Sequence, residues 1–203
     1  MSCHGAKGEG NARAGFPRLA RASAPYLKAQ LDAFANGQRQ STVMQPFAKI
    51  MASEGSIAVA EYFNHLPPPD THPTNSDSAA PSDTRAWLAT RGHREQGLPA
   101  CAQCHGPGGS GVGAAFPPLA GQPASYISAQ LHARQKGLRP PGPLSLMPVI
   151  ASKLSEADIT ASSDYYAGEP LAGNLKRVGD VVRSVPWVMR PLPSASSECD
   201  SDT

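Results

Sequence analysis

The stretch Cys101-Ala102-Gln103-Cys104-His105 is the most informative part of this sequence. Two cysteines separated by two residues and followed directly by histidine form the attachment site of c-type haem. One helical turn brings the sulfurs to about the separation of the porphyrin vinyl groups, and the imidazole then lies under the ring, where it can bind iron. A bare CxxC pattern also occurs in zinc and thiol redox sites. The adjoining histidine favours haem c on Cys101 and Cys104, with His105 as an iron ligand.

The same pattern occurs twice in the chain. His4-Gly5 and His105-Gly106 are each followed by matching residues, which keep a constant offset of 100 from the phenylalanine to the arginine. They are Phe16-Pro17-Arg18-Leu19, Tyr26, Gln30-Leu31 and Gly37-Gln38-Arg39 in the first copy, and Phe116-Pro117-Pro118-Leu119, Tyr126, Gln130-Leu131 and Gly137-Leu138-Arg139 in the second. Further on, Met44, Ala48 and Tyr62 match Met147, Ala151 and Tyr165. Self-similarity this dense indicates two copies of one fold.

The length of 203 residues leaves room for two small domains. We expect a first copy at residues 1–66, a linker rich in Pro and Ser at 67–83, a second copy at 84–168 and a tail at 169–203. Domains this small bury little core, so a large covalently held apolar cofactor would complete each one. The formal net charge of +2 gives no reason to expect a nucleic-acid partner. No apolar run is long enough to predict a transmembrane segment.

Helical signals predominate within each copy. Residues 25–34 place apolar side chains at helical spacing, and Gly37 follows as a stop; residues 123–137 are the counterpart. Ser155 is suited to cap a helix that runs through Tyr166, matched by residues 53–63. Residues 84–91 predict another helix that leads into the haem motif. Because no strand pattern stands out, the fold class we expect is all-α.

A sixth iron ligand is expected from the other side of each ring. A methionine thioether there gives a high-potential electron-transfer centre. Met147 follows His105 and Met44 follows His4 at similar distances, and both methionines are expected in loops between the same two helices. Methionine is often only core filler. Met51 fits that role, because its counterpart is Leu154, whereas Met44 and Met147 match each other.

Several further side chains have candidate roles. The free ring N–H of each histidine is expected to donate to the carbonyl of Pro117 or Pro17, unless these prolines only stiffen the loop. Arg39 and Arg139 either pair with haem propionates or are solvated. For the remaining histidines, surface positions are expected rather than ligation; they are His65, His72, His93 and His132.

The repeated motifs, from Cys-His-Gly through Phe-Pro-x-Leu, Tyr-x-x-x-Gln-Leu and Gly-x-Arg to the methionine, resemble those of dihaem cytochromes c of the c4 class. These are periplasmic electron carriers built from two tandem class I cytochrome c domains. The resemblance covers about four fifths of the chain. It implies haem c in both domains, His/Met ligation, and transfer of single electrons to a terminal oxidase or related membrane-bound complex. It also implies a carrier rather than an enzyme, which meets its redox partners in small, short-lived interfaces.

The first copy departs from this pattern at its start. Cys3 and His4 are present, but the first cysteine of the pair would fall one residue before Met1, and the helix equivalent to 84–91 is missing. We expect Met1 to be an internal residue of a longer, exported chain, which would restore this N-terminal helix and a signal peptide. Two haems are then expected in the full-length protein, with one securely supported here. The tail, with Trp187 and Cys199, has no counterpart in the first copy.

Three other classes of protein remain to be weighed. A dihaem cytochrome subunit of a dehydrogenase, such as a flavocytochrome that oxidises sulfide, has the same tandem fold and size. A dihaem peroxidase needs an open iron position, which a methionine candidate at each site disfavours. A zinc or thiol redox module does not explain why His4, Met44 and Met147 fall in register.

Overall fold

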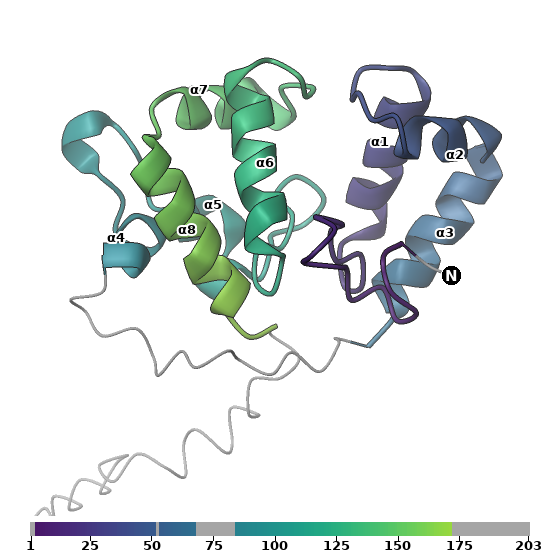
Figure 1. The fold of residues 1–203 in the computed structure, drawn as a ribbon, viewed down its shortest axis with the longest axis horizontal. Coiled ribbons are helices and arrows are strands. Elements are labelled where there is room, and N and C mark those ends of the chain that lie inside the picture. The colour runs from purple at the N-terminus through teal and green to yellow at the C-terminus, as the bar shows by residue number, and fades with distance from the viewer. Residues whose placement is uncertain (1–2, 52, 68–83, 172–203) are drawn as a thin grey trace, which may run out of the picture.

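The structure is a computed structural model that describes residues 3–51, 53–67 and 84–171. These residues fold into two helical halves that lie side by side (Figure 1). The N-terminal half contains α1 (Ala24–Ala35), α2 (Met44–Ile50) and α3 (Ser53–His65). The C-terminal half contains α4 (Thr84–Thr90), α5 (Cys101–His105), α6 (Ala124–Gln135), α7 (Leu146–Ser152) and α8 (Glu156–Gly168), with short 3-10 turns at Arg94–Gln96, Pro107–Gly109 and Pro143–Ser145.

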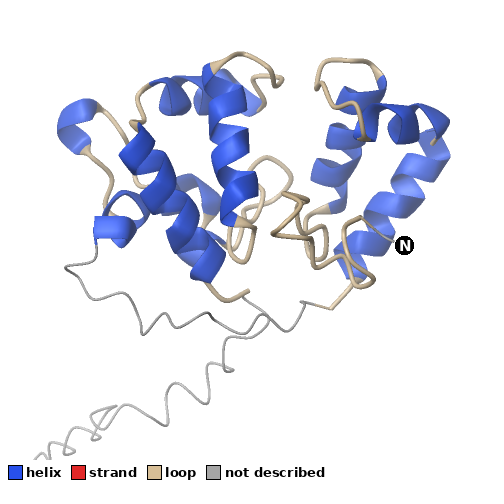
Figure 2. Ribbon diagram, in the orientation of Figure 1, coloured by secondary structure: helices blue, strands red, loops and turns tan. Residues whose placement is uncertain are grey.

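The described residues form helices and loops without strands (Figure 2), which confirms the all-α prediction. Only isolated bridges occur, and two of them recur in the repeat: Asn11 pairs with Phe16, and Val112 pairs with Phe116. Each bridge closes the loop between the histidine and the Phe-Pro segment. The predicted domain boundaries stay a prediction, because residues 68–83 of the linker and 172–203 of the tail, including Trp187 and Cys199, lie outside the described residues.

Local sequence signals account for the helix ends. In α1, Pro25 occupies the first turn, where its missing N–H costs no hydrogen bond, and Gly37 follows the helix with φ +80°. In α8, the Ser155 side chain accepts from the Asp158 backbone N–H while Asp158 accepts from the Ser155 backbone N–H. This reciprocal capping box satisfies two otherwise unpaired donors and confirms Ser155 as the cap.

The two halves repeat one packing arrangement. Helix α1 packs on α2 and α3, and α6 packs on α7 and α8 in the same way. The C-terminal half adds α4, which packs on α8 and α5. Its core is correspondingly larger and contains Leu88, Leu98, Ile127, Ile159 and Tyr166, whereas the N-terminal core is mostly alanine around Leu27.

Among the described residues of the N-terminal half no helix takes the place of α4, which predicts that Ile57, Tyr62 and Phe63 of α3 are less covered. Tyr62 is 57% exposed, in line with that expectation. Phe63 is only partly exposed because it packs on the core around Leu27, whereas its counterpart Tyr166 is fully buried. The expectation was wrong for Ile57: its counterpart Thr160 is exposed even beside α4, so this position faces outward in both halves.

Candidate functional site

The two histidines of the repeated motif have the same hydrogen-bonded environment. His105 Nδ1 lies 2.8 Å from the Pro117 carbonyl oxygen, and His4 Nδ1 lies 2.8 Å from the Pro17 carbonyl oxygen. A carbonyl only accepts, so each Nδ1 carries the proton and each Nε2 keeps its lone pair. The predicted contacts with the two prolines are confirmed, and they leave Nε2 as the ring nitrogen that is available for the predicted bond to iron.

Burial favours the neutral form of the His105 ring, and in the other half one buried ring nitrogen of His4 has no partner in the described part of the chain. Burial lowers the pKa of His105, against the hydrogen bond to Pro117, which raises it. His4 Nε2 is buried and has no hydrogen-bond partner among the described residues. A buried ring nitrogen of this kind is costly unless something binds it. The ring of each histidine also lies near a phenylalanine, with centroids 5.9 Å apart for His4 and Phe16 and 6.1 Å apart for His105 and Phe116.

The cysteines of the C-terminal half lie on the single-turn helix α5, which ends at His105. This turn places Cys101, Cys104 and His105 at the wall of one cavity. Burial raises the pKa of the Cys101 thiol to about 11, so this cysteine is poorly suited to thiolate chemistry. It packs instead against the core formed by Leu88, Leu98, Leu154 and Ile159. In the N-terminal half, Cys3 is exposed and lines the same cavity.

The cavity has a volume of about 1060 Å³ and extends across both halves. It is bordered by all the site residues predicted from the sequence: Cys3, His4, Met44, Cys101, Cys104, His105 and Met147. Met44 and Met147 were expected in loops, but the structure places them in the first turns of α2 and α7. The donor set, an apolar cavity and the unpartnered His4 nitrogen together fit a haem with histidine and methionine on its two sides.

Arg39 and Arg139 lie where the two halves meet. Arg39 is buried, 7% exposed, and donates to Tyr126 Oη at 3.0 Å and Gln130 Oε1 at 2.8 Å in the opposite half. Arg139 donates to Gln30 Oε1 at 2.8 Å in the N-terminal half. The solvated alternative is therefore wrong for Arg39. Propionate pairing stays a prediction, which is supported by the position of both arginines on the cavity wall.

We call this group the interface cluster: Tyr26, Gln30, Arg39, Tyr126, Gln130 and Arg139. Among the described residues, no carboxylate forms an ion pair with its arginines. Burial raises the pKa of Tyr126, but the charges of Arg39 and Arg139 outweigh it and lower the pKa overall. Sequence reasoning missed the roles of Gln130 and Tyr126. Their i, i+4 spacing in a repeated Tyr-x-x-x-Gln segment is the signal that could have shown them on one helix face.

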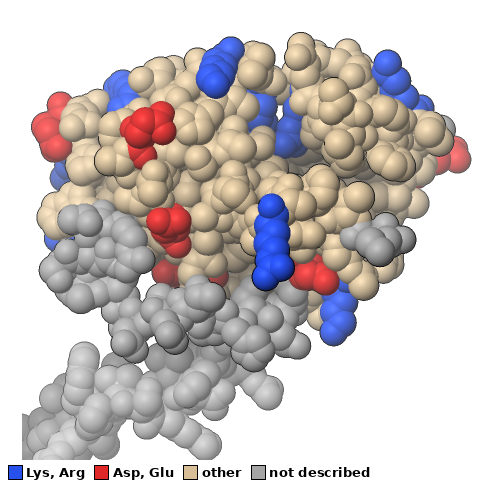
Figure 3. Space-filling view, viewed as in Figure 1, with Lys and Arg blue, Asp and Glu red and all other residues tan. Residues whose placement is uncertain are grey.

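One face of the molecule carries few charges (Figure 3). Figure 3 shows a largely uncharged face with scattered acidic and basic side chains, and with basic side chains visible in the hollow between the two halves. The described helices include none that is both long and apolar enough to cross a membrane.

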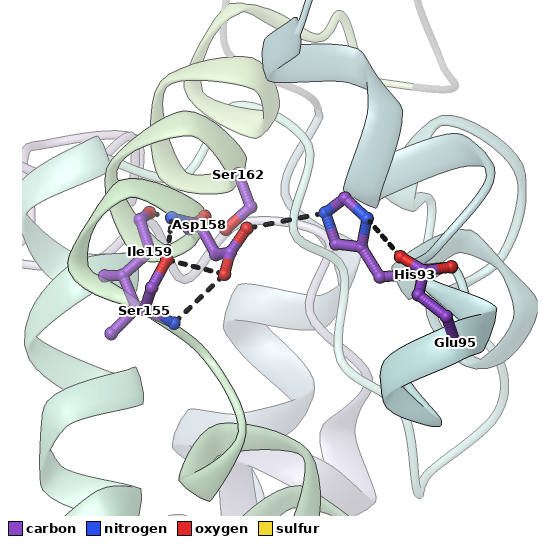
Figure 4. Close-up of polar contacts among 6 residues, drawn as sticks. All are labelled: His93, Glu95, Ser155, Asp158, Ile159 and Ser162. Atoms are coloured by element: carbon purple, nitrogen blue, oxygen red, sulfur yellow. Dashed lines mark hydrogen bonds and ion pairs between the residues drawn. The ribbon is translucent and has the colours of Figure 1, made fainter.

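A second polar group lies away from the cavity, at the start of α8 (Figure 4). His93 Nε2 is 3.5 Å from Asp158 Oδ1, and His93 Nδ1 is 3.6 Å from Glu95 Oε1. The His93 side chain is only partly exposed, and it joins the 93–98 loop to the capped end of α8. Its ring is therefore occupied by structural contacts, in agreement with a surface position rather than ligation.

Comparison with known proteins agrees with this geometry. The cytochrome c family matches residues 98–165. A thiosulfate dehydrogenase electron acceptor from Stutzerimonas stutzeri strain A1501 is 45% identical over 166 residues, which cover 82% of this chain and 76% of that protein. The solved thiosulfate dehydrogenase TsdBA from Marichromatium purpuratum matches with TM-score 0.74 and 42% identity over 83% of this chain and 36% of that one.

Reduced recombinant cytochrome c4 from Pseudomonas stutzeri matches with TM-score 0.72 and 31% identity. The match covers 83% of this chain and 92% of that structure, so it extends across both halves and not one domain alone. The two histidine environments match each other, and both halves border one cavity. Together with the likeness over most of the chain, this shows that the chain belongs to the cytochrome c4 class of the cytochrome c family, whose cofactor is haem c.

Proposed function

We propose that this chain is a periplasmic dihaem electron carrier that accepts single electrons from a thiosulfate dehydrogenase and passes them to a terminal oxidase or related membrane-bound complex. The observation that carries the choice of donor is the 45% identity to a thiosulfate dehydrogenase electron acceptor, against 31% to the solved cytochrome c4. Attachment of haem c to a CxxCH motif takes place outside the inner membrane, which supports the periplasmic location.

In this proposal the haem iron supplies the redox chemistry by changing between its ferric and ferrous states. Cys101 and Cys104 hold one haem, and Cys3 contributes to holding the other. His105 and Met147 bind iron in the C-terminal half, and His4 and Met44 bind it in the N-terminal half. Thioether ligands favour the ferrous state, so both sites would have high potentials suited to accepting electrons.

The chain's own residues also favour rapid transfer between the two sites. Both sets of ligands border one cavity, and the interface cluster crosses between the halves with buried hydrogen bonds. These hydrogen bonds would keep the two haem sites at a fixed separation. Electrons can then enter at one half and leave from the other without a large rearrangement.

Exposed apolar side chains around α2 and α7 support short-lived contacts with partners. Beside Met44, Val43 is 42% and Phe47 is 57% exposed; beside Met147, Leu146 is 37% and Val149 is 56% exposed. Apolar surface with few charges suits small interfaces that form and separate quickly.

The test is reduction of the oxidised dihaem protein by thiosulfate. We expect the visible bands of ferrous haem to grow only when a thiosulfate dehydrogenase and thiosulfate are both present. Omission of either component is the control. If dithionite reduces the haems but the complete mixture does not, this choice of donor is wrong.

A dehydrogenase subunit is the second candidate, because the chain resembles 36% of the longer TsdBA chain. Size-exclusion chromatography of the dehydrogenase with this protein separates the two possibilities. A stable joint peak at micromolar concentration favours the subunit, whereas separate peaks with rapid reduction favour the mobile carrier.

A further inference from the structure

One side chain of the C-terminal half forms a two-bond clamp on the backbone of the N-terminal half. Gln122 Oε1 accepts from the Arg18 backbone N–H at 3.0 Å, and Gln122 Nε2 donates to the Arg18 carbonyl at 2.9 Å. Both residues are buried, with Arg18 1% and Gln122 7% exposed. At these buried positions bulk water competes little with the clamp, which strengthens both hydrogen bonds.

The clamp continues a hydrogen bond that begins at a proposed iron ligand. The Arg18 N–H belongs to the same peptide group as the Pro17 carbonyl, and that carbonyl accepts from His4 Nδ1 at 2.8 Å. A peptide whose N–H donates to a good acceptor becomes more polarised, and its carbonyl oxygen accepts more strongly, by roughly 10–30% per bond. His4, Pro17, Arg18 and Gln122 therefore form one continuous chain of hydrogen bonds, which we call the relay.

The C-terminal half cannot form the equivalent relay. His105 donates to the Pro117 carbonyl in the same way, but the next residue is Pro118, which has no backbone N–H. The counterpart of Gln122 is Ala22, whose side chain has no acceptor. Both partners of the clamp are therefore absent from the otherwise matching half.

The Arg18 guanidinium is not part of the relay, which uses only the backbone of Arg18. It donates to the Ala20 carbonyl of its own half and, at 2.8 Å, to the Ala120 carbonyl of the other half. These two alanines are counterparts in the repeat, so the cation lies between equivalent points of the two halves. Burial lowers its pKa to about 10, which leaves it charged at neutral pH. Its charge should act on both sites together.

We propose that Gln122 is a positioning residue for electron transfer, which acts through the relay to lower the reduction potential of the N-terminal haem alone. A stronger Pro17 acceptor makes His4 a more electron-donating ligand, and this stabilises ferric iron. The relay thereby sets the difference between the two haem potentials, while the Arg18 cation raises both. This inference rests on the proposed two-haem carrier.

The test is a redox titration of the holoprotein followed by haem absorbance, with Met44→Ala and Met147→Ala used to assign the two components. We expect Gln122→Leu to raise the N-terminal potential and leave the C-terminal one unchanged. The equilibrium constant for sharing an electron between the haems should change about threefold, or about 28 mV at 59 mV per tenfold. Ser125→Ala is the matched control, since it removes another bond between the halves, to Ala12, outside the relay.

Two variants of Arg18 separate the relay from the charge. Arg18→Pro copies the Pro-Pro sequence of the C-terminal half and should change the difference in potential as Gln122→Leu does. Arg18→Met keeps the N–H and should lower both potentials in parallel. An unchanged difference in both Gln122→Leu and Arg18→Pro overturns the relay, even though the carrier proposal stands. A single haem in the unaltered protein overturns the two-haem carrier and the relay with it.

Discussion

Arg39→Ala should detach the two halves from each other and destabilise the N-terminal one. The variant removes two charged hydrogen bonds to the C-terminal half, to Tyr126 and Gln130, and one to Gln30 in its own half. The two bonds between the halves contribute about 3 kcal/mol or more at the lower value for charged donors. Release of a buried guanidinium, which also lies 4.5 Å from the centroid of the Phe34 ring, offsets part of this loss.

We therefore expect a net loss of about 2 kcal/mol, which falls on the half with the smaller core. For a domain of this size, this corresponds to a decrease in melting temperature of roughly 10 °C. Differential scanning calorimetry should show an earlier transition for the N-terminal half, with the later one little changed.

Arg139→Ala should have a smaller effect, because its contact with Tyr26 Oη is 3.5 Å long, the outer limit of a hydrogen bond. Arg13→Ala, at an exposed position, is the control and should not alter the profile. If Arg39→Ala melts in the same way as the Arg13→Ala control, the interface cluster does not hold the halves together.

Three further predictions concern the sites and the fold. Met147→Ala should remove most of the weak long-wavelength band of the iron–thioether bond and open that iron to carbon monoxide, whereas Met51→Ala should not; an unaltered spectrum excludes Met147 as a ligand. Haem staining of a denaturing gel should survive Cys3→Ala and disappear when Cys3, Cys101 and Cys104 are all replaced by alanine; loss of all stain in Cys3→Ala alone would mean that the attachment site is wrong. Burial raises the pKa of Asp158, but hydrogen bonds from Ser155 and the charge of His93 lower it overall. Its contribution to stability is therefore present above the ordinary value of 3.8 and lost as the pH falls through the lower folded value. Chemical denaturation at a series of pH values measures this effect. As the pH falls, the free energy of unfolding of Asp158→Asn should decrease less than that of the unaltered protein.

The fold class, the cofactor and the repeat could all be predicted from the amino-acid sequence alone. These properties follow from local chemistry: one helical turn spaces Cys101 and Cys104, and helical periodicity places α1, α3, α4, α6 and α8 within one or two residues of their ends. It did not predict α2 and α7, which were expected as loops. The Pro17 and Pro117 contacts were also predicted, because the histidine and the Phe-Pro segment are close in the chain and the loop between them is repeated. Met44 and Met147 were predicted as iron ligands because they occupy matching positions in the two copies.

The contacts between the two copies could be seen only in the folded structure. The contact from Arg39 to Gln130 joins residues 91 positions apart, and the clamp from Gln122 to Arg18 joins residues 104 apart. Neither has a local pattern, because the partners meet only when two separately folded halves dock. A repeat also predicts that matching positions have the same role. It therefore does not indicate that Arg18 and Gln122 form a clamp that their counterparts Pro118 and Ala22 cannot form. Docking also changes the role of Arg39. An arginine is ordinarily solvated, but the docked surfaces leave Arg39 only 7% exposed, so its guanidinium donates hydrogen bonds to the other half instead of to water.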